Sequence, residues 1–585
     1  MANDQATTTP QARLRDPVEM EVFSNRLLTI TEEMGHTLVR ASFSTNIKER
    51  QDCSVALFDA RGRLVAQASH VPLHLGSLMG SVEAVLAAYP PSVIEDGDAF
   101  VCNDPYLAGG THMPDISIVT PVFYDGKPRF FTANIAHHSD VGGSVPGSIS
   151  GGARSIFEEG LRIPAIKIVR KGVLDRDLLR LISSNSRDPT ERTLDLQVQV
   201  STNERGAAMV RDLIGRMGIT LVEQSIEDLL IYTRERLTGR LALLGGRQVS
   251  ATSWMDDDGL AGEPVAIRAA VSVRNDKLVI DFTGSAPQAR GAMNIPPSAL
   301  RAAVYFSVKT LLDPELPPNS GFFDAVEITA PEGTIVNPKA PAAVGARSLG
   351  CNKVVRAIVT AFTDLLPPER KLAPGHDAVP AIVFSGDQKS RAGQFVYLET
   401  MGGGLGASAT ADGMDAIQVH MTNTSNLPVE ALEHEYPLVV EEYAMVPDSG
   451  GAGRYRGGLG LARQIRAAVD GVVFSARSDN HVIAPSGMDG GRSGRLAHLT
   501  WNYGRANARE LSSKESALSL RAGDSVRLET AGGGGFGPVE ERPAALLAED
   551  LRSGKLSRAN AEQLYGAEAV EQALRTGSDT GRSRK

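Results

Sequence analysis

The chain has 585 residues, 42% of them hydrophobic and 22% charged, which is the composition of an ordinary globular protein. At about 150 residues per domain, this length predicts several domains. The 69 acidic and 60 basic side chains give a net charge of −9, and a pI of about 5.8 excludes the basic surface field that nucleic-acid binding uses. We therefore expect no nucleic-acid partner.

Targeting and redox signals are sparse. The three cysteines, Cys53, Cys102 and Cys351, lie far apart without a CxxC, which argues against a disulfide framework or a thiolate zinc site. The first residues lack the apolar segment of a signal peptide, and no run reaches the roughly 18 apolar residues of a membrane span. We expect a cytoplasmic protein without membrane contact, whose residues 1–15 are disordered.

The first half of the chain alternates helices with hairpins. Asp16 as an N-cap and Pro17 at the first helical position predict a long helix up to Ser42. Two strands should follow within residues 52–67, joined by an Asp59–Gly62 turn, and two more on either side of Asp125-Gly126. Further helices are predicted at residues 75–89, 174–182 and 194–244. Residues 16–248 form the predicted N-terminal domain.

The pattern of hydrophobic residues changes near Val249. Residues 264–284 alternate like strands around an Asn275-Asp276 turn, and helices are predicted at 300–312 and 352–366, which gives a middle α/β domain over 249–373. Residues 374–538 are rich in glycine and short strands. Residues 539–585 contain a predicted helical hairpin that turns at Ser553–Lys555. The fold class expected from these elements is α+β, multidomain, with antiparallel hairpins.

One loop carries the residues of a candidate metal site. In NDPYLAGGTHMPDIS, His112 and Asp115 lie three residues apart, and AHHSD follows on the returning strand of the next hairpin. Strand alternation places His137 on the face of Phe131, opposite His138, and the hairpin returns His137 to the His112 loop. Imidazole and carboxylate ligands together suit zinc, manganese or iron.

The same pattern has a plain structural interpretation. Loop histidines and turn aspartates most often make only hydrogen bonds that hold a loop, and spacing alone favours that interpretation over a metal site. Asp52, at the start of an earlier strand, is the candidate for a fourth ligand.

Nucleotide motifs are missing or unconvincing. No G-x-x-x-x-G-K-[ST] occurs, so this chain has no P-loop. Gly532, Gly534 and Gly537 fit G-x-G-x-x-G, but Pro538 follows at once and no βαβ context surrounds them. We interpret these glycines as sites where backbones approach closely.

Several ordered blocks together resemble one family. They are NDPYLAGGTHMPDISIVTPVF, AHHSDVGGSVPGSISGGA, DFTGSAPQARGAMNIP, NTSNLPVEALEHEYPLVVEEY, PDSGGAGRYRGGLGLAR and AGGGGFGPVEER, and they are similar to blocks of the hydantoinase B/oxoprolinase family. The resemblance implies an ATP-dependent hydrolase of cyclic amides such as hydantoin, N-methylhydantoin, 5-oxoproline or a lactam. It also implies an A-type partner with an actin-like site for ATP and Mg, in an A2B2 heterotetramer. The A-type partner would phosphorylate the ring amide, and this B-type chain would hydrolyse the activated carbonyl.

The resemblance also implies roles for particular residues. The metal ligands fall on His112, Asp115 and His137, with Asp52 as the fourth and with zinc or manganese as the ion. Asp140 and Glu159 are the candidate catalytic proton acceptors. Asp104 and His74 are candidates to support the ligands or line the substrate pocket.

Two alternatives stay open. The chain could be a subunit of an ATP-dependent ketone carboxylase of the acetone or acetophenone type, in which the same metal pocket would join an enol and carbon dioxide. It could also be a non-catalytic scaffold subunit whose histidines and acids only stabilise turns.

Overall fold

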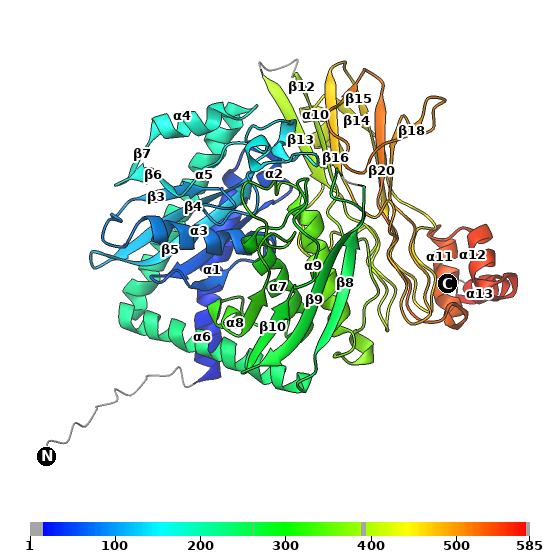
Figure 1. Ribbon diagram of the computed structural model, residues 1–585, viewed down its shortest axis with the longest axis horizontal. Coiled ribbons are helices and arrows are strands. Elements are labelled where there is room, and N and C mark those ends of the chain that lie inside the picture. The colour runs from blue at the N-terminus through cyan, green and yellow to red at the C-terminus, as the bar shows by residue number, and fades with distance from the viewer. Residues whose placement is uncertain (1–15, 261, 388–392, 581–585) are drawn as a thin grey trace.

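The computed structural model describes residues 16–260, 262–387 and 393–580 (Figure 1). Helices and largely antiparallel sheets alternate along the chain, which confirms the predicted α+β class. Residues 1–15, predicted to be disordered, lie outside the described residues. Within the described ranges, no helix combines the length and the apolar character needed to cross a bilayer.

The N-terminal part is built on a seven-stranded antiparallel sheet of order β2-β1-β5-β4-β3-β6-β7. Its strands are β1 Cys53–Asp59, β2 Leu64–Gln67, β3 Ala99–Cys102, β4 Asp115–Tyr124, β5 Lys127–His137, β6 Ile166–Arg170 and β7 Val173–Leu174. The predicted turns are present: Asp125 and Gly126 have φ of 50° and 70°, which suits a two-residue hairpin. This turn fixes the register between β4 and β5.

Helices cover both faces of this sheet. They are α1 Pro17–Ala41, α2 Thr45–Lys48, α3 His74–Ala88, α4 Arg176–Ser184, α5 Pro189–Met217 and α6 Ile219–Leu241. Asp16 caps α1 as predicted, accepting a hydrogen bond from the Val18 amide. In β1, Val55 faces the cluster formed with α1 and α5, whereas the next residue, Ala56, faces the cluster that contains α3. The sheet is therefore buried on both sides.

The helix predicted over residues 194–244 is wrong in its extent. It begins at Pro189 and is interrupted at Gly218, whose φ of 81° and ψ of 141° cannot continue a helix. The result is two helices, and α5 runs along the sheet beside β4 and β5.

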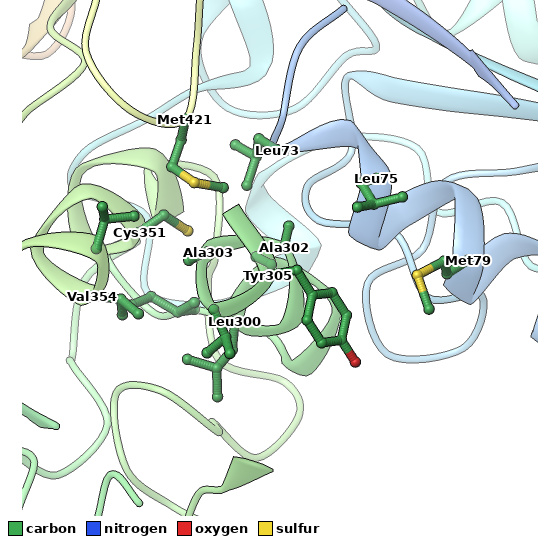
Figure 2. Packing of buried hydrophobic residues seen from close by; sticks show 14 of the residues in the cluster. Leu73, Leu75, Met79, Leu300, Ala302, Ala303, Tyr305, Cys351, Val354 and Met421 are labelled. Carbon is green, nitrogen blue, oxygen red and sulfur yellow. The ribbon is translucent and has the colours of Figure 1, made fainter. Parts of the chain in front are cut away.

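The middle part has a four-stranded sheet of order β11-β10-β9-β8, formed by β8 Val249–Met255, β9 Val265–Arg274, β10 Lys277–Asp281 and β11 Val326–Thr329. Its helices are α7 Pro297–Leu312, α8 Ser320–Phe323 and α9 Arg347–Phe362. Figure 2 shows α7 between α3 and α9, with Met421 reaching the same cluster from a loop of the C-terminal half. One hydrophobic core thus joins the seven-stranded sheet to the middle sheet.

The C-terminal part contains two antiparallel sheets packed face to face. The first has order β13-β12-β16-β19 and the second β14-β15-β20-β17-β18. Their bounds are β12 Ala381–Asp387, β13 Gln394–Thr400, β14 Leu438–Met445, β15 Leu461–Ala467, β16 Val472–Arg477, β17 His498–Trp501, β18 Arg509–Glu510, β19 Leu518–Leu520 and β20 Ser525–Glu529, with α10 Val429–Glu435 between β13 and β14. Phe384 and Tyr397 of one sheet share a core with Ile465 and Leu528 of the other.

A bundle of extended glycine-rich segments lies between these sheets and the C-terminal helices (Figure 1). We call residues 402–407, 449–460, 485–495 and 530–537 the glycine bundle. Backbone hydrogen bonds join the segments: the Gly404 amide donates to Ala531, and the Gly533 amide donates to Gly458. A Cβ at Gly404 would lie 2.0 Å from the Gly458 oxygen. The prediction that these glycines allow close backbone packing is confirmed.

The prediction of a helical hairpin at the C-terminal end is wrong in the number of helices. Three helices are present, α11 Ala544–Arg552, α12 Arg558–Tyr565 and α13 Ala567–Thr580. The predicted turn at residues 553–555 separates the first two, and Gly566, with φ of 87°, separates the last two. Because a helix cannot continue through a glycine with such a positive φ, α12 ends at Gly566 without a longer loop.

Candidate metal centre

The β4–β5 hairpin places two predicted ligands opposite each other. Asp115 is the first residue of β4, and its direct cross-strand partner is His137, the last residue of β5. His112 precedes β4 in a tight turn, in which the Asp115 amide donates to the His112 oxygen over 3.3 Å. Strand pairing and one turn are enough to bring the three side chains together.

The glycine pair before His112 seats this loop on α3. A Cβ at Gly109 would lie 2.4 Å from the Cα of Gly80 in α3, and a Cβ at Gly110 would lie 2.0 Å from the Asn103 oxygen. Neither position has room for a side chain. The loop can therefore lie directly against the helix whose first residue is His74.

His112, Asp115 and His137 form a buried triad of ligand atoms. The Asp115 Oδ1 lies 2.9 Å from the His112 Nε2 and 3.0 Å from the His137 Nδ1, and these two nitrogens are 3.2 Å apart. All three residues are buried, and their ligand atoms lie within 4.8 Å of one another. The structure thus brings together the three ligands predicted from the loop and the hairpin.

Asp52 and His74 lie beside the triad. The His74 Nε2 is 3.5 Å from the Asp52 Oδ1 and 3.8 Å from the Asp115 Oδ1. The backbone oxygen of Asp52 accepts a hydrogen bond from the His137 amide, which ties the start of β1 to the end of β5. The His74 Nδ1 is 3.1 Å from the Ser54 hydroxyl. Both predicted residues therefore face the same small volume.

Burial controls the protonation of the site. It lowers the pKa of His74 and, together with the positive charge of Arg347, holds the pKa of His112 well below 6.5. Burial opposes ionisation of Asp115, but His112 and the ion pair with Arg347 hold its pKa well below 3.8. Neutral imidazoles and an ionised carboxylate are the forms that bind metals.

The donor set fits a divalent cation. Ligands held about 2.1 Å from an ion in tetrahedral or octahedral arrangement lie about 3.0–3.4 Å apart, close to the separations of 2.9, 3.0 and 3.2 Å found here. The Gly345 oxygen lies 3.3 Å from the His112 Nδ1, and a proton on that nitrogen would leave Nε2 free to bind. The Arg347 Nη1, 3.0 Å from the same Nδ1, suits the other tautomer.

Two arginines that local patterns do not reveal complete the site. Arg347, the first residue of α9, pairs with the Asp115 Oδ2 at 2.7 Å and donates to the Thr111 hydroxyl. Arg477, the last residue of β16, donates to the Gly345 oxygen at 2.6 Å. Both lie more than 200 residues from the triad in sequence, so nothing in the spacing around His112 signals them.

These residues line a cavity of about 40 Å³, which has room for about three water molecules. Its walls come from all three parts of the chain: Asp52, Val71, Leu73, His74, His112, Asp115, His137, Arg347, Ser348, Val379, Leu398, Thr400, Met421, Thr422 and Arg477.

Three other predicted site residues hold loops near this cavity and do not line it. Asp140 accepts from the Gly142 and Gly147 amides and pairs with Arg187 at 2.7 Å. Asp104 pairs with Arg162 at 2.7 Å and accepts from two amides of its own loop.

Glu159 binds backbone that is in contact with the site residues. It accepts from the Val344 and Gly345 amides, which fixes the segment before α9. Gly345 in turn contacts His112 and Arg477 through its oxygen. Burial raises the pKa of Glu159 to about 7.

His138 faces away from the triad, as strand alternation predicts. It is nevertheless fully buried, because α5 covers that face of the sheet. Its Nε2 lies 2.9 Å from the Gln199 Oε1, and Arg192 contacts its Nδ1. These contacts anchor the end of β5 behind His137.

Comparisons with known proteins identify relatives of this chain. Residues 16–539 match the family model described as hydantoinase B/oxoprolinase. The chain is 31% identical to a Pseudomonas sp. strain NS671 protein that is named as the B component of a D-/L-hydantoinase, covering 94% of this chain and 95% of that one. It is 34% identical to 5-oxoprolinase 1 of Arabidopsis thaliana over 89% of its length, but spans only 42% of that protein.

A solved structure has the same fold. The crystal structure of ATP-dependent caprolactamase from Pseudomonas jessenii superposes with a TM-score of 0.87 at 25% identity, covering 96% of this chain and 99% of that chain.

Proposed function

This chain belongs to the hydantoinase B/oxoprolinase family, and from that premise we propose that it is the metal-binding B-type component of an ATP-dependent cyclic-amide hydrolase. The candidate substrates are hydantoin, N-methylhydantoin, 5-oxoproline and lactams, which include the compounds named in its relatives. The observation that carries the proposal is the buried triad His112, Asp115 and His137 on the wall of a small cavity.

The proposed division of labour follows from the weak reactivity of amides. An A-type subunit with its own ATP and Mg phosphorylates the ring amide oxygen and releases ADP. On this chain water then adds to the activated carbon, the ring C–N bond breaks as its nitrogen takes up a proton, and inorganic phosphate leaves, which gives the ring-opened acid. His112, Asp115, His137 and Asp52 would hold zinc or manganese, which when bound supplies Lewis-acid chemistry and promotes ionisation of water. The name of the Pseudomonas relative, as one component of a hydantoinase, supports a separate partner, and A2B2 is the assembly we expect.

In this proposal, His74 takes the proton released by the attacking water. Its Nε2 faces the cavity, and burial lowers its pKa, so the ring is neutral and able to accept. Asp140 and Glu159, suggested by the sequence for this role, keep the surrounding loops in position through their hydrogen bonds. Asp104 does the same for the loop that carries His112.

Co-expression with an A-type subunit tests the proposal. The purified complex should consume ATP in the presence of a hydantoin, 5-oxoproline or a lactam and release the ring-opened acid, and a chelator should stop ring opening. Bicarbonate-dependent turnover of a ketone, without amide hydrolysis, would instead identify a carboxylase subunit. A complete complex that contains no zinc or manganese by elemental analysis would support the scaffold alternative.

A further inference from the structure

Arg477 is a buried cation without an anionic partner. It is 4% exposed, its Nη1 donates to the backbone oxygen of Gly345, and its Nε has no hydrogen-bond partner in the described part of the chain. Among the described residues, no carboxylate lies within ion-pair distance of it, whereas its neighbour Arg347 pairs with Asp115 at 2.7 Å. A buried charge without a counter-ion is unfavourable, so a buried guanidinium that lines a cavity favours an anionic occupant.

The amino-terminal end of α9 contributes to the same place. α9 has 16 residues, begins at Arg347, and lacks a side-chain hydrogen bond at its N-cap. Ser348, its second residue, is 4% exposed and lines the cavity with Arg477. Within residues 16–260, 262–387 and 393–580, no group hydrogen-bonds to its hydroxyl. The Arg347 and Leu349 amides already donate to the Val344 and Ala346 oxygens, so this end attracts an anion through the helix dipole and the Ser348 hydroxyl.

The charges around the cavity suit an anion once the ligands are satisfied. Asp52 and Asp115 lie where a metal ion would bind, and Arg347 is already paired with Asp115. The positive charge of Arg477 therefore has no carboxylate to pair with. Burial and the neighbouring Arg347 lower the pKa of Arg477 to about 9, and the more distant Asp115, Glu159 and Asp52 offset this only in part.

We propose that Arg477, Ser348 and the amino-terminal end of α9 form an oxyanion subsite beside the metal centre, which holds the phosphoryl group of the activated substrate. The identity of this group rests on the proposed function, whereas the subsite itself rests on the contacts above. A phosphoryl group offers several charged acceptors, which match a guanidinium and a hydroxyl at the positive end of a helix dipole better than a single carboxylate does. Its position would aim the activated carbon at the triad.

Calorimetric titration of the full chain with inorganic phosphate tests the subsite. The titration is made with zinc bound, when the charges of Asp52 and Asp115 are compensated, and is repeated after a chelator has removed the metal, so that binding through the ion is distinguished from binding to the subsite. We expect Arg477→Gln to weaken phosphate binding at least about tenfold and Arg477→Lys to recover part of the loss. Ser348→Ala should weaken it about tenfold. Arg180→Gln, at an exposed arginine of α4, is the matched control and should bind like the unmodified chain.

Each other outcome overturns the proposal. Unchanged phosphate affinity in both Arg477→Gln and Ser348→Ala, or no phosphate binding by the unmodified chain, removes the subsite. If Arg477→Gln fails to fold, as a thermal melt would show, Ser348→Ala decides, because it deletes only a hydroxyl without a partner. A parallel titration with 5-oxoproline distinguishes the source of the anion: if the variants weaken 5-oxoproline and not phosphate, the subsite binds a substrate carboxylate and the phosphoryl assignment is wrong.

This titration needs neither the A-type subunit nor ATP. A complex that opens no cyclic amide would overturn the proposed function while leaving phosphate binding in place. Conversely, if the complex opens cyclic amides but the isolated B-type chain does not bind phosphate, the proposed function stands and the subsite is refuted.

Discussion

Asp115 links the ligand cluster to the arginine beside it. Its Oδ1 faces the nitrogens of His112 and His137, and its Oδ2 accepts from Arg347 and from the Thr111 hydroxyl. One carboxylate thus organises both imidazoles and is itself held in orientation. Such support from a second layer of contacts is how proteins fix the geometry of metal ligands.

Asp115→Asn should abolish metal binding while preserving the fold. The amide has nearly the same shape, but it lacks the charge that a divalent ion requires, so we expect the variant to retain no zinc or manganese. Elemental analysis after dialysis against zinc or manganese measures this loss. Asp377→Asn is the matched control, because Asp377 is equally buried and pairs with Arg356 and His420 away from the cavity. Equal metal content in the two variants would remove Asp115 from the ligand set.

The raised pKa of Glu159 predicts a specific pH dependence of the free energy of unfolding. Its pKa is about 7 in the folded chain against 4.5 for an ordinary glutamate, because burial disfavours the charged form. The contribution of Glu159 to the free energy of unfolding is fully present below pH 4.5 and is lost as the pH rises through about 7. This loss amounts to about 3 kcal/mol. Glu159→Gln should therefore be more stable than the unmodified chain at pH 8 and no more stable at pH 5.

Urea unfolding at the two pH values measures this difference. Glu263→Gln, at an exposed glutamate, should leave the pH dependence unchanged. The same pH dependence in Glu159→Gln as in the unmodified chain would show that another group is responsible.

At the scale of elements, the glycine bundle is the least ordinary part of the fold. Its segments pack backbone against backbone, so that a Cβ at Gly457 would lie 1.9 Å from the Gly533 oxygen and one at Gly532 would lie 1.9 Å from the Ser449 oxygen. No rotamer can relieve a clash between a Cβ and a main-chain oxygen. The side chain itself is what these positions exclude.

Gly404→Ala should therefore be severely destabilising, by more than about 4 kcal/mol, or prevent folding. Gly215→Ala provides the control: Gly215 lies in α5 with nothing within 4 Å of an added Cβ, and alanine there should stabilise the chain by about 0.5–1 kcal/mol. Thermal melts of both variants measure the contrast. Similar melting of Gly404→Ala and the unmodified chain would mean that the segments are not packed as described.

Elements with strong local signals could be predicted from the sequence. The capped start of α1 at Asp16 and the hairpin turn at Asp125 were found because the signals lie within a few residues. The breaks at Gly218 and Gly566 were missed, since a glycine between two helical patterns marks an interruption only when its φ is known. The close packing within the glycine bundle could be inferred, but not which segments contact each other.

The whole molecule assembles the cavity from distant parts. The triad and His74 come from the seven-stranded sheet and α3, Arg347 from the middle part, and Arg477 from the C-terminal sheets. The proximity of the triad side chains was predictable because one hairpin and the loop before it contain them, whereas their role as ligands was inferred from the family resemblance. The arginines were not, because their position depends on how α9 and β16 pack against that hairpin. The domain limits at residues 248, 373 and 538 and the cytoplasmic location stay predictions.

Metal removal should affect the stability of the whole chain. An ion whose free concentration is a thousand times its dissociation constant raises the free energy of unfolding by about 4 kcal/mol, provided that the unfolded chain does not bind it. We expect a chelator to lower the melting temperature of the unmodified chain and zinc or manganese to restore it, as scanning calorimetry would record. The Asp115→Asn variant should show no such response, and a response equal to that of the unmodified chain would place the stabilising ion elsewhere.

The glycine bundle also has a thermal consequence. Its segments are joined by backbone hydrogen bonds and bury little aliphatic side-chain surface, in contrast to the sheet cores around Phe384 and Phe131. The heat-capacity change of unfolding comes mainly from exposed apolar surface, and exposed polar surface reduces it. The bundle therefore contributes less heat-capacity change per residue than the rest of the chain, and its share of the stability varies less steeply with temperature.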